Sequence, residues 1–289
     1  MTTESSPDDV RVSGLFSYPI KSCAGISHET AVLETTGLAH DREWMLVDTR
    51  YSPARFITQR EQPLLATVRV DLDAMGSLVL SSSGAETLHV SRPNDARSLI
   101  RVKVWSSEVF GITVNEVAAA WFAKILGMSA SHLALVFFHR EYPRVCNAKF
   151  AGDSGAQTFF ADGYPVLVTN QASLDDLNTR MRRTDENKLP MNRFRPNIVL
   201  SRLDAWDEDH IDTLTIDGAV IKLVKPCVRC EITTTDQTSG SKLSDEPLNT
   251  LARFRSNPDV GGVTFGWNAV VSHGGRLSRN QRVTINYRF

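Results

Sequence analysis

Two cysteines stand three residues apart in KPCVRCEITTTDQ, residues 225–237. A structural zinc site needs four Cys or His ligands, usually as two close pairs, and beyond this one pair the chain offers only scattered histidines such as His210 and His273. A redox dithiol belongs at the start of a helix, whereas residues 231–235 are typical of a strand. Two interpretations remain from the residues alone: inert cysteines at a strand entry, or one thiolate bound to a metal that prefers soft ligands.

Basic and hydroxyl side chains recur where predicted strands begin or end. In YPIKSCAG, Lys21 and Ser22 offer a point charge and a neutral donor to a phosphate, and the alternative is a solvated strand end. In HDREWMLVD, Arg42 carries a planar fork that grips phosphate through two hydrogen bonds. The alternative for Arg42 is an ordinary ion pair with Asp41 or Glu43.

Two later segments add to this set. In NRFRPNIVLS, Arg193 and Arg195 alternate about Phe194, so an extended chain would point both to one face, as an anion site or a salt-bridged rim. In FFADGYPVLVTN, Asp162 precedes Gly163 and is either a turn former or a carboxylate at the edge of a pocket. A thiolate ligand together with phosphate-binding groups indicates molybdenum carried on a pterin.

The elements that position these residues are mostly strands. From residue 10 to about 114, short runs rich in Val, Ile, Thr and aromatic residues are separated by Gly, Pro, Asp or Ser, which predicts a meandering sheet or barrel. Helices do not alternate regularly with strands, so a doubly wound parallel sheet is disfavoured. We expect strands at 133–138, 164–169, 195–201, 213–224 with a turn at Asp217-Gly218, 230–236, 265–272 and 281–288, and helices at 115–127, 171–183 and 247–255.

The helix predicted over residues 115–127 has clear ends. Asn115 is a candidate N-cap and Gly127 a candidate C-terminal residue with left-handed backbone. Its apolar face is expected to consist of Val117, Ala118, Trp121, Phe122 and Ile125. We expect this helix to pack against the core and to take no part in chemistry.

Composition narrows the function classes. The chain has 289 residues, is 42% hydrophobic and carries a net charge of -1, which supports a large core and gives no electrostatic reason to expect a nucleic-acid partner. Four cysteines favour reduced thiols, with Cys23 and Cys146 as small buried side chains. Neither a signal peptide nor an apolar run of membrane-spanning length is evident, and GxGxxG and GxxxxGK[ST] do not occur. We therefore expect a cytoplasmic protein without membrane attachment.

The ordered segments YPIKSCAG, HDREWMLVD, FADGYP, NRFRPNIVL, KPCVRCEITTTDQTSG and FGWNAVV together resemble the MOSC-domain family preceded by its N-terminal β-barrel domain, in particular its amidoxime-reducing branch. The resemblance implies a β-rich mixed α+β fold, in which a MOSC β-barrel with a few packed helices shares an interface with an N-terminal β-barrel-like domain. The implied bounds are a disordered tail over 1–9, the N-terminal domain over 10–135 and the MOSC domain over 136–289.

The resemblance also implies a function. It predicts a molybdenum cofactor, Mo-molybdopterin, and the reduction of N-hydroxylated substrates such as amidoximes, hydroxylamines and N-hydroxylated bases. It further carries an association with pyridoxal phosphate binding. Cys230 matches the metal ligand, Asp162 matches an aspartate near the metal that is a candidate for proton delivery, and Cys227 matches a position without such a role. The residues that match cofactor-binding positions are Lys21, Ser22, Arg42, Gly163, Tyr164, Arg195, Arg229 and Cys230.

The expected partners follow from what the chain lacks. Several bacterial relatives carry a C-terminal ferredoxin-like domain, and this chain ends at Phe289 without one. We therefore expect a separate electron donor, an iron–sulfur or haem protein with a flavin reductase. Two alternatives remain open: a molybdenum cofactor carrier or sulfur-handling protein without reductase activity, and a binding module for some other anion.

Overall fold

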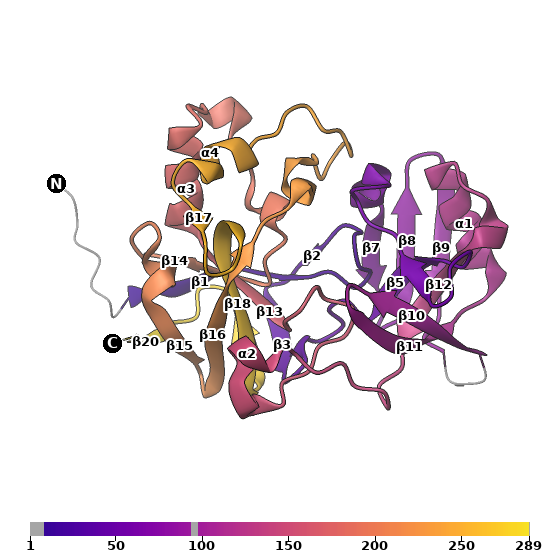
Figure 1. The fold of residues 1–289 in the computed structure, drawn as a ribbon, viewed down its shortest axis with the longest axis horizontal. Coiled ribbons are helices and arrows are strands. Elements are labelled where there is room, and N and C mark those ends of the chain that lie inside the picture. Colours follow the sequence, from indigo (N-terminus) through magenta and orange to yellow (C-terminus); the bar gives the residue numbers. More distant parts are fainter. Residues whose placement is uncertain (1–8, 94–97, 289) are drawn as a thin grey trace.

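Two β-rich lobes lie side by side in the computed structural model, which describes residues 9–93 and 98–288 (Figure 1). Apart from Asp9, the expected disordered tail lies outside the described residues. Asp9 forms ion pairs with Arg11, at 3.0 Å, and with Arg202. Within the described residues, no helix has the length and apolar character needed to cross a membrane.

The larger lobe is built on a nine-stranded sheet in the order β2-β1-β14-β13-β18-β16-β15-β20, with β17 paired to β18. The strand β1 pairs antiparallel with β14, so the beginning of the chain completes a sheet made mostly from its second half. The bounds 10–135 and 136–289 for two domains stay a prediction. The strands are β1 (Arg11–Ser17), β2 (Ile26–Ser27), β13 (Val166–Asn170), β14 (Ile198–Ser201), β15 (Ile211–Ile216), β16 (Ala219–Val228), β17 (Ser256–Asn257), β18 (Gly262–His273) and β20 (Thr284–Tyr287).

The smaller lobe contains a closed barrel in the order β10-β11-β12-β5-β6 and a sheet in the order β7-β8-β9. Their bounds are β5 (Trp44–Asp48), β6 (Ala54–Phe56), β7 (Arg69–Leu72), β8 (Leu78–Ser82), β9 (Ala85–Val90), β10 (Leu99–Val104), β11 (Ser107–Thr113) and β12 (Leu133–Phe138). A third sheet joins β3 (Thr30–Glu34), β4 (Gly37–Leu38) and β19 (Gly275–Ser278). The β-rich fold with a barrel in the first half is confirmed.

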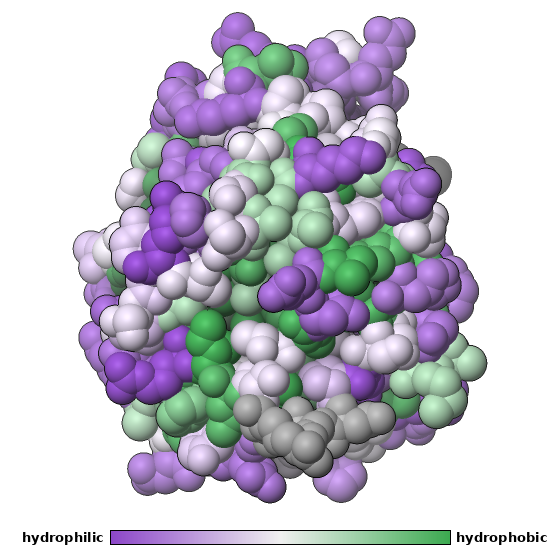
Figure 2. All heavy atoms as spheres, turned by 90° about the vertical axis from the view of Figure 1, so that its right-hand side faces the viewer, coloured by the Kyte–Doolittle hydropathy of each residue, from purple (hydrophilic) through white to green (hydrophobic). Residues whose placement is uncertain are grey.

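The helices cap these sheets. They are α1 (Glu116–Leu126), α2 (Ala148–Ala151), α3 (Gln171–Arg180) and α4 (Leu248–Ala252), with 3-10 turns at Pro63–Thr67, Ala130–His132, Gly152–Ser154, Asp185–Asn187, Met191–Phe194, Asp207–His210 and Glu231–Thr234. Each lobe has its own apolar core, formed around Val168, Leu214 and Ile221 in the larger and around Trp44, Phe122 and Leu135 in the smaller. On the face of the smaller lobe shown in Figure 2, apolar side chains form separate patches among hydrophilic ones.

Both predicted ends of α1 are confirmed. The Asn115 side chain accepts a hydrogen bond from the Ala118 amide at 3.4 Å, and Gly127 has left-handed backbone with φ of 64°. The predicted apolar face is rotated, because Val117 is 57% exposed whereas Ala118, Trp121 and Phe122 are buried. The Trp121 indole nitrogen donates to the Glu86 carbonyl at 2.6 Å, which fixes the helix against β9.

Two predicted extended segments are wrong, and both lie near the cysteine pair. Residues 230–236 do not form a strand, because β16 ends at Val228 and a 3-10 turn follows over Glu231–Thr234. The hydroxyl of Thr233 donates to the Cys230 carbonyl at 2.9 Å, and that of Thr234 to the Glu231 carbonyl at 2.7 Å. Threonines that bond nearby carbonyls in this way favour a turn over a strand ladder.

The second wrong segment is NRFR. Residues Met191–Phe194 form a 3-10 turn, and Arg195 has left-handed backbone with φ of 54°. Arg193 therefore turns away and pairs with Asp236 at 2.8 Å, whereas Arg195 stays at the pocket described below. Of the two interpretations offered for this segment, the salt-bridged rim applies to Arg193, and only Arg195 is placed where an anion site is possible.

Candidate functional site

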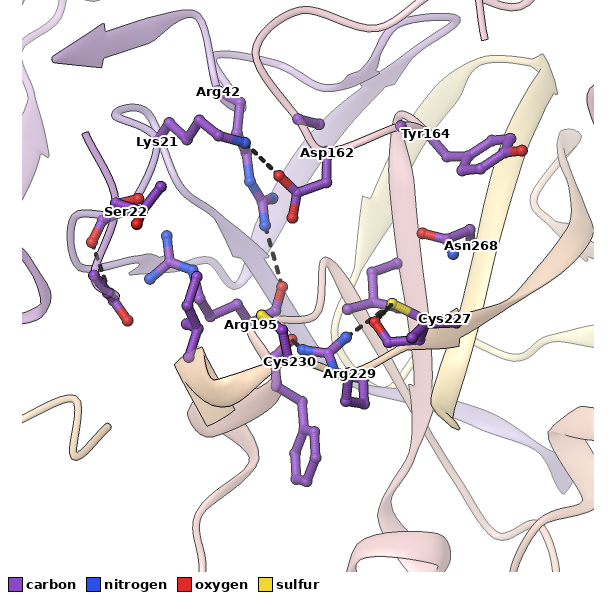
Figure 3. Close-up of a pocket in the computed structure, with 18 of the residues that line it drawn as sticks. Lys21, Ser22, Arg42, Asp162, Tyr164, Arg195, Cys227, Arg229, Cys230 and Asn268 are labelled. Carbon is purple, nitrogen blue, oxygen red and sulfur yellow. Dashed lines mark hydrogen bonds and ion pairs between the residues drawn. The ribbon is translucent and has the colours of Figure 1, made fainter. Parts of the chain in front are cut away.

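Every residue matched to a metal-ligand, proton-delivery or cofactor-binding position lines one pocket, to which both lobes contribute, whereas Arg193 does not line it (Figure 3). From the first part of the chain come Lys21, Ser22 and Arg42, and from the second come Asp162, Gly163, Tyr164, Arg195, Arg229 and Cys230. Cys227 lines the same pocket. These residues lie mainly in connections between strands, where sequence can vary without breaking a ladder of backbone hydrogen bonds.

Two arginines that line one wall of the pocket bracket the ring of Tyr18, which lies behind them. The guanidinium carbons of Arg42 and Arg195 each lie 4.2 Å from the centre of the Tyr18 ring. Burial raises the pKa of Tyr18 to about 12 and lowers the pKa of Arg195 to about 10, so the ring stays neutral and the arginine stays charged at neutral pH. The wall presents two fixed cations to the pocket.

Arg42 lines the pocket and also forms the ion pair considered as its alternative role. Its Nη1 lies 2.6 Å from each carboxylate oxygen of Asp41, which confirms the ion pair, and its Nη2 donates to the Arg195 carbonyl at 3.2 Å. Ser22, Arg42 and Arg195 all have left-handed backbone, with φ between 50° and 72°. That conformation costs a residue with a side chain about 1–2 kcal/mol, and such positions cluster at functional sites.

Lys21 and Asp162 form the second feature, an ion pair that joins the two halves of the chain. Lys21 Nζ lies 2.5 Å from Asp162 Oδ1 and donates to the Phe160 carbonyl at 2.8 Å. The Lys21 side chain is 8% exposed and that of Asp162 is 69% exposed, so the carboxylate faces the pocket while the ammonium is covered.

Burial and the attraction between Lys21 and Asp162 together set the protonation states of the two groups. Burial alone would raise the pKa of Asp162, but the Lys21 ammonium and the Trp105 indole N–H hold it well below its usual range. Burial lowers the pKa of Lys21, and the Asp162 carboxylate opposes that shift. The Asp162 side chain is open to solvent, so the ion pair affects its pKa more than burial does. Asp162 is therefore ionised, and Lys21 carries the proton of the pair.

A buried arginine holds the segment that carries Asp162. Arg144 donates to the carbonyls of Phe159 at 3.1 Å, Asp162 at 2.8 Å and Ala161. Three carbonyls on one guanidinium fix the path of an otherwise irregular segment. Asp162 is therefore placed by its backbone as well as by Lys21.

The two cysteines have different surroundings. Arg229 Nη1 donates to Cys227 Sγ at 2.9 Å, and its Nη2 donates to the Phe194 carbonyl at 2.7 Å. Cys230 is exposed to the pocket, no hydrogen bond to its sulfur is found among the described residues, and in Figure 3 the Arg229 guanidinium lies between the two sulfur atoms. Among the described residues, no three His, Cys, Asp or Glu side chains gather as metal ligands. This asymmetry supports the one-thiolate interpretation over zinc.

Unpartnered polar atoms test whether a pterin cofactor suits this pocket. Among residues 9–93 and 98–288, the buried Nε atoms of Arg60 and Arg229 have no hydrogen-bond partner, and a side chain at Gly163 would meet open space. A donor set of a free thiol, guanidinium groups and an open backbone position fits a phosphate-bearing, thiol-ligated group. Tyr164 points away from Lys21 and Arg42, which agrees with a contact through its backbone (Figure 3).

Several lining residues were missed by sequence reasoning. Gln59 donates to the Ser22 carbonyl at 2.6 Å and exchanges amide hydrogen bonds with Gln237, at 3.1 and 3.0 Å. The available signal was the polar stretch TQRE, residues 58–61, which begins inside the predicted extended run RFITQ. The other missed lining residues are Phe56, Thr58, Arg60, Ala161, Leu167, Phe194, Asn197, Val228, Ile232 and Asn268.

Comparisons with known proteins match most of the chain. Residues 9–129 match the MOSC N-terminal beta barrel domain and residues 156–284 match the MOSC domain. The mitochondrial amidoxime reducing component 2 of Bos taurus is 33% identical over 250 residues, covering 84% of this chain and 72% of that protein. Component 1 of Mus musculus is 30% identical over 249 residues, covering 84% and 71%. The molybdenum cofactor sulfurase of Oryza sativa subsp. japonica is 28% identical over 281 residues, 92% of this chain and 33% of that protein.

Proposed function

The chain belongs to the MOSC-domain family, and from this premise we propose that it is a molybdenum cofactor-dependent reductase of N-hydroxylated compounds. The observation that carries the proposal is the pocket itself, in which an exposed, unpaired thiol lies among fixed cations. The amidoxime-reducing relatives, which match over 84% of this chain, support the reaction class.

The residues that line the pocket have distinct roles in this proposal. Cys230 would hold the molybdenum of Mo-molybdopterin, and the backbone at Gly163 and Tyr164 would lie against the pterin. When bound, the cofactor supplies two-electron redox chemistry. The side chains that would hold the pterin and its phosphate are Lys21, Ser22, Arg42, Arg195 and Arg229.

The reaction consumes protons as well as electrons. An N-hydroxylated substrate takes up two electrons and two protons, the N–O bond breaks, and an amine or amidine and water leave. The covered Lys21 Nζ holds a proton 2.5 Å from an ionised carboxylate, so the pair can present that proton at the pocket. We propose Asp162 as the anchor of this proton, and the role in proton delivery expected for it from the resemblance stays a prediction.

Electrons would come from a separate protein. We propose an iron–sulfur or haem partner with a flavin reductase, together with a small N-hydroxylated substrate. The predicted association with pyridoxal phosphate and the cytoplasmic location stay predictions.

A second candidate is a cofactor carrier or sulfur-handling protein without reductase activity. The match to a molybdenum cofactor sulfurase, over 92% of this chain, favours it. Both candidates need the same cofactor pocket, so they differ in turnover and not in binding. A module for another anion would need no molybdenum.

The test combines metal analysis with turnover. Protein purified from cells that make the cofactor is assayed for molybdenum, and benzamidoxime is supplied with reduced methyl viologen as the electron source. We expect stoichiometric molybdenum and the formation of benzamidine. Molybdenum without reduction of any amidoxime or hydroxylamine would indicate the carrier, and its absence would indicate the anion-binding module.

A further inference from the structure

The turn between β10 and β11 places an unassigned aromatic side chain beside the pocket. Trp105 Nε1 donates to Asp162 Oδ1 at 3.0 Å, and the indole ring packs edge-on against Phe56, with 5.2 Å between centroids. The guanidinium of Arg60 lies 4.6 Å from the indole centroid. Asp162, Phe56 and Arg60 all line the pocket, so Trp105 stands at its rim.

Arg60 differs from the other arginines of the pocket. The guanidinium groups of Arg42, Arg195 and Arg229 each donate hydrogen bonds to protein groups, whereas none from the Arg60 side chain is found in the part of the chain that the structure describes. Among those residues the buried Nε of Arg60 also has no hydrogen-bond partner. A cation with unused donors, stacked on an aromatic ring, is available to a ligand.

The backbone and exposure of Trp105 point the same way. Its φ of 56° lies in the left-handed region, which a bulky side chain rarely adopts, and the residue is 44% exposed. An exposed indole adds little to the stability of the fold, and left-handed backbone is unfavourable for tryptophan. A role in ligand binding explains why the turn keeps Trp105 in this position.

We propose that Trp105 and Arg60 form a stacking subsite that receives the planar ring of an aromatic N-hydroxylated substrate. The inference rests on the proposed function and extends it to substrate choice. The indole hydrogen bond to Asp162 fixes the ring beside the Lys21–Asp162 pair, so a substrate ring on Trp105 keeps its N–OH group near the proton on Lys21. Aliphatic substrates lack the ring and gain nothing from this subsite.

The test compares two substrates with the same reacting group. Benzamidoxime carries a phenyl ring where acetamidoxime carries a methyl group, so the ratio of their KM values isolates the ring contact. Stacking on an aromatic side chain predicts that Trp105→Ala raises the KM of benzamidoxime relative to acetamidoxime by about 10-fold. Trp105→Phe keeps an aromatic face without the N–H and should leave the ratio within about 3-fold of wild type.

Tyr51 supplies a matched control on the same lobe. It is 48% exposed, the guanidinium of Arg55 lies 4.9 Å from its ring centroid, and it does not line the pocket. Tyr51→Ala should leave both KM values unchanged. Molybdenum content is measured for every variant, so that loss of cofactor is separated from loss of the ring contact.

The outcomes distinguish a failure of the stacking subsite from a failure of the proposed function. A wild-type protein that reduces neither amidoxime rejects the proposed function. Reduction of both, with the same KM ratio in wild type and Trp105→Ala, overturns the stacking subsite and leaves the function standing. A ratio that changes equally in Trp105→Ala and Trp105→Phe also overturns it, because the indole N–H and not the ring face would then be responsible.

Discussion

At the scale of single residues, the pocket derives its chemistry from pairs whose members have unequal surroundings. Lys21 is covered while Asp162 is open to the pocket. Cys227 receives a guanidinium hydrogen bond while Cys230 is exposed. In each pair one member is fixed by protein contacts and the other is left accessible to a ligand.

The Lys21–Asp162 pair predicts a shift in the pH profile. Burial lowers the pKa of Lys21 and the Asp162 carboxylate opposes this, so Asp162→Asn removes the group that favours the charged lysine. Deprotonation of Lys21 should then occur at lower pH, and the alkaline limb of kcat against pH should move to lower pH. The measurement is the pH dependence of benzamidoxime reduction at saturating substrate.

Lys21→Arg is the matched variant for this prediction. It keeps a cation beside Asp162 that does not titrate near neutral pH, so its alkaline limb should move up or disappear. An alkaline limb at the wild-type position in both variants would show that the pair does not control protonation.

At the scale of elements, buried polar groups fix the junctions between helices and strands. Glu208 in the turn Asp207–His210 is completely buried; its Oε2 accepts from Ser173 Oγ at 2.7 Å and from Asn170 Nδ2 at 3.2 Å. These contacts tie the start of α3 to the turn. The other oxygen, Oε1, is buried without a hydrogen-bond partner.

This arrangement predicts a pH dependence of stability. Burial raises the pKa of Glu208 to about 6, above its ordinary value of 4.5, so between these values the folded protein binds more protons than the unfolded chain. The free energy of unfolding should therefore fall as the pH rises through this window, by roughly 2 kcal/mol from this group. Urea unfolding of wild type and Glu208→Gln at pH 4.5 and pH 7 measures it, since glutamine does not titrate. A difference between the two proteins that is independent of pH would contradict the prediction.

Sequence patterns predicted helix ends and turns well where neighbouring residues alone determine the backbone conformation. The Asn115 cap, the Gly127 end of α1 and the Asp217-Gly218 turn, where both residues have positive φ, needed only neighbouring residues. Residues 231–234 were wrongly predicted as a strand because β-branched residues favour strands on average. In the structure, the hydroxyls of Thr233 and Thr234 instead donate to carbonyls three residues earlier in the chain.

The candidate site was predictable only in part. The basic, hydroxyl and thiol residues were found because their types imply chemistry, and all of them except Arg193 line the pocket. Trp105 and Arg60 were missed because their importance depends on contacts between distant segments, which a pattern along the chain does not contain. Arg193 and Arg195 diverge because Arg195 has left-handed backbone, a conformation that no glycine at this position signals and that the following Pro196 does not predict.

At the scale of the whole molecule, the pocket belongs to neither lobe alone. Strand β1 pairs with β14 in the larger sheet, and Lys21 and Ser22, which follow β1 in the chain, line the pocket. The hydrogen bond from Trp105 to Asp162 and the ion pair from Lys21 to Asp162 both link distant parts of the chain. A ligand in this pocket therefore contacts segments from both parts of the sequence at once.

This predicts that bound cofactor protects both lobes. Any group that binds only the folded protein stabilises it by mass action, and here the contacts span the two lobes. Hydrogen exchange of cofactor-loaded protein, compared with cofactor-free protein, should slow at residues 20–23 and at 229–233 together. Protection confined to one of these segments would show that the cofactor does not bridge the pocket.

The central claim is that a single thiolate, Cys230, holds molybdenum in this pocket while Cys227 does not. The most direct measurement is the molybdenum content of wild type, Cys227→Ala and Cys230→Ala, purified in parallel from cells that make the cofactor, with benzamidoxime reduction assayed on the same samples. We predict stoichiometric metal and turnover in wild type, values near these in Cys227→Ala, and loss of metal-dependent turnover in Cys230→Ala. Equal loss in both variants, or full turnover in Cys230→Ala, would contradict the account.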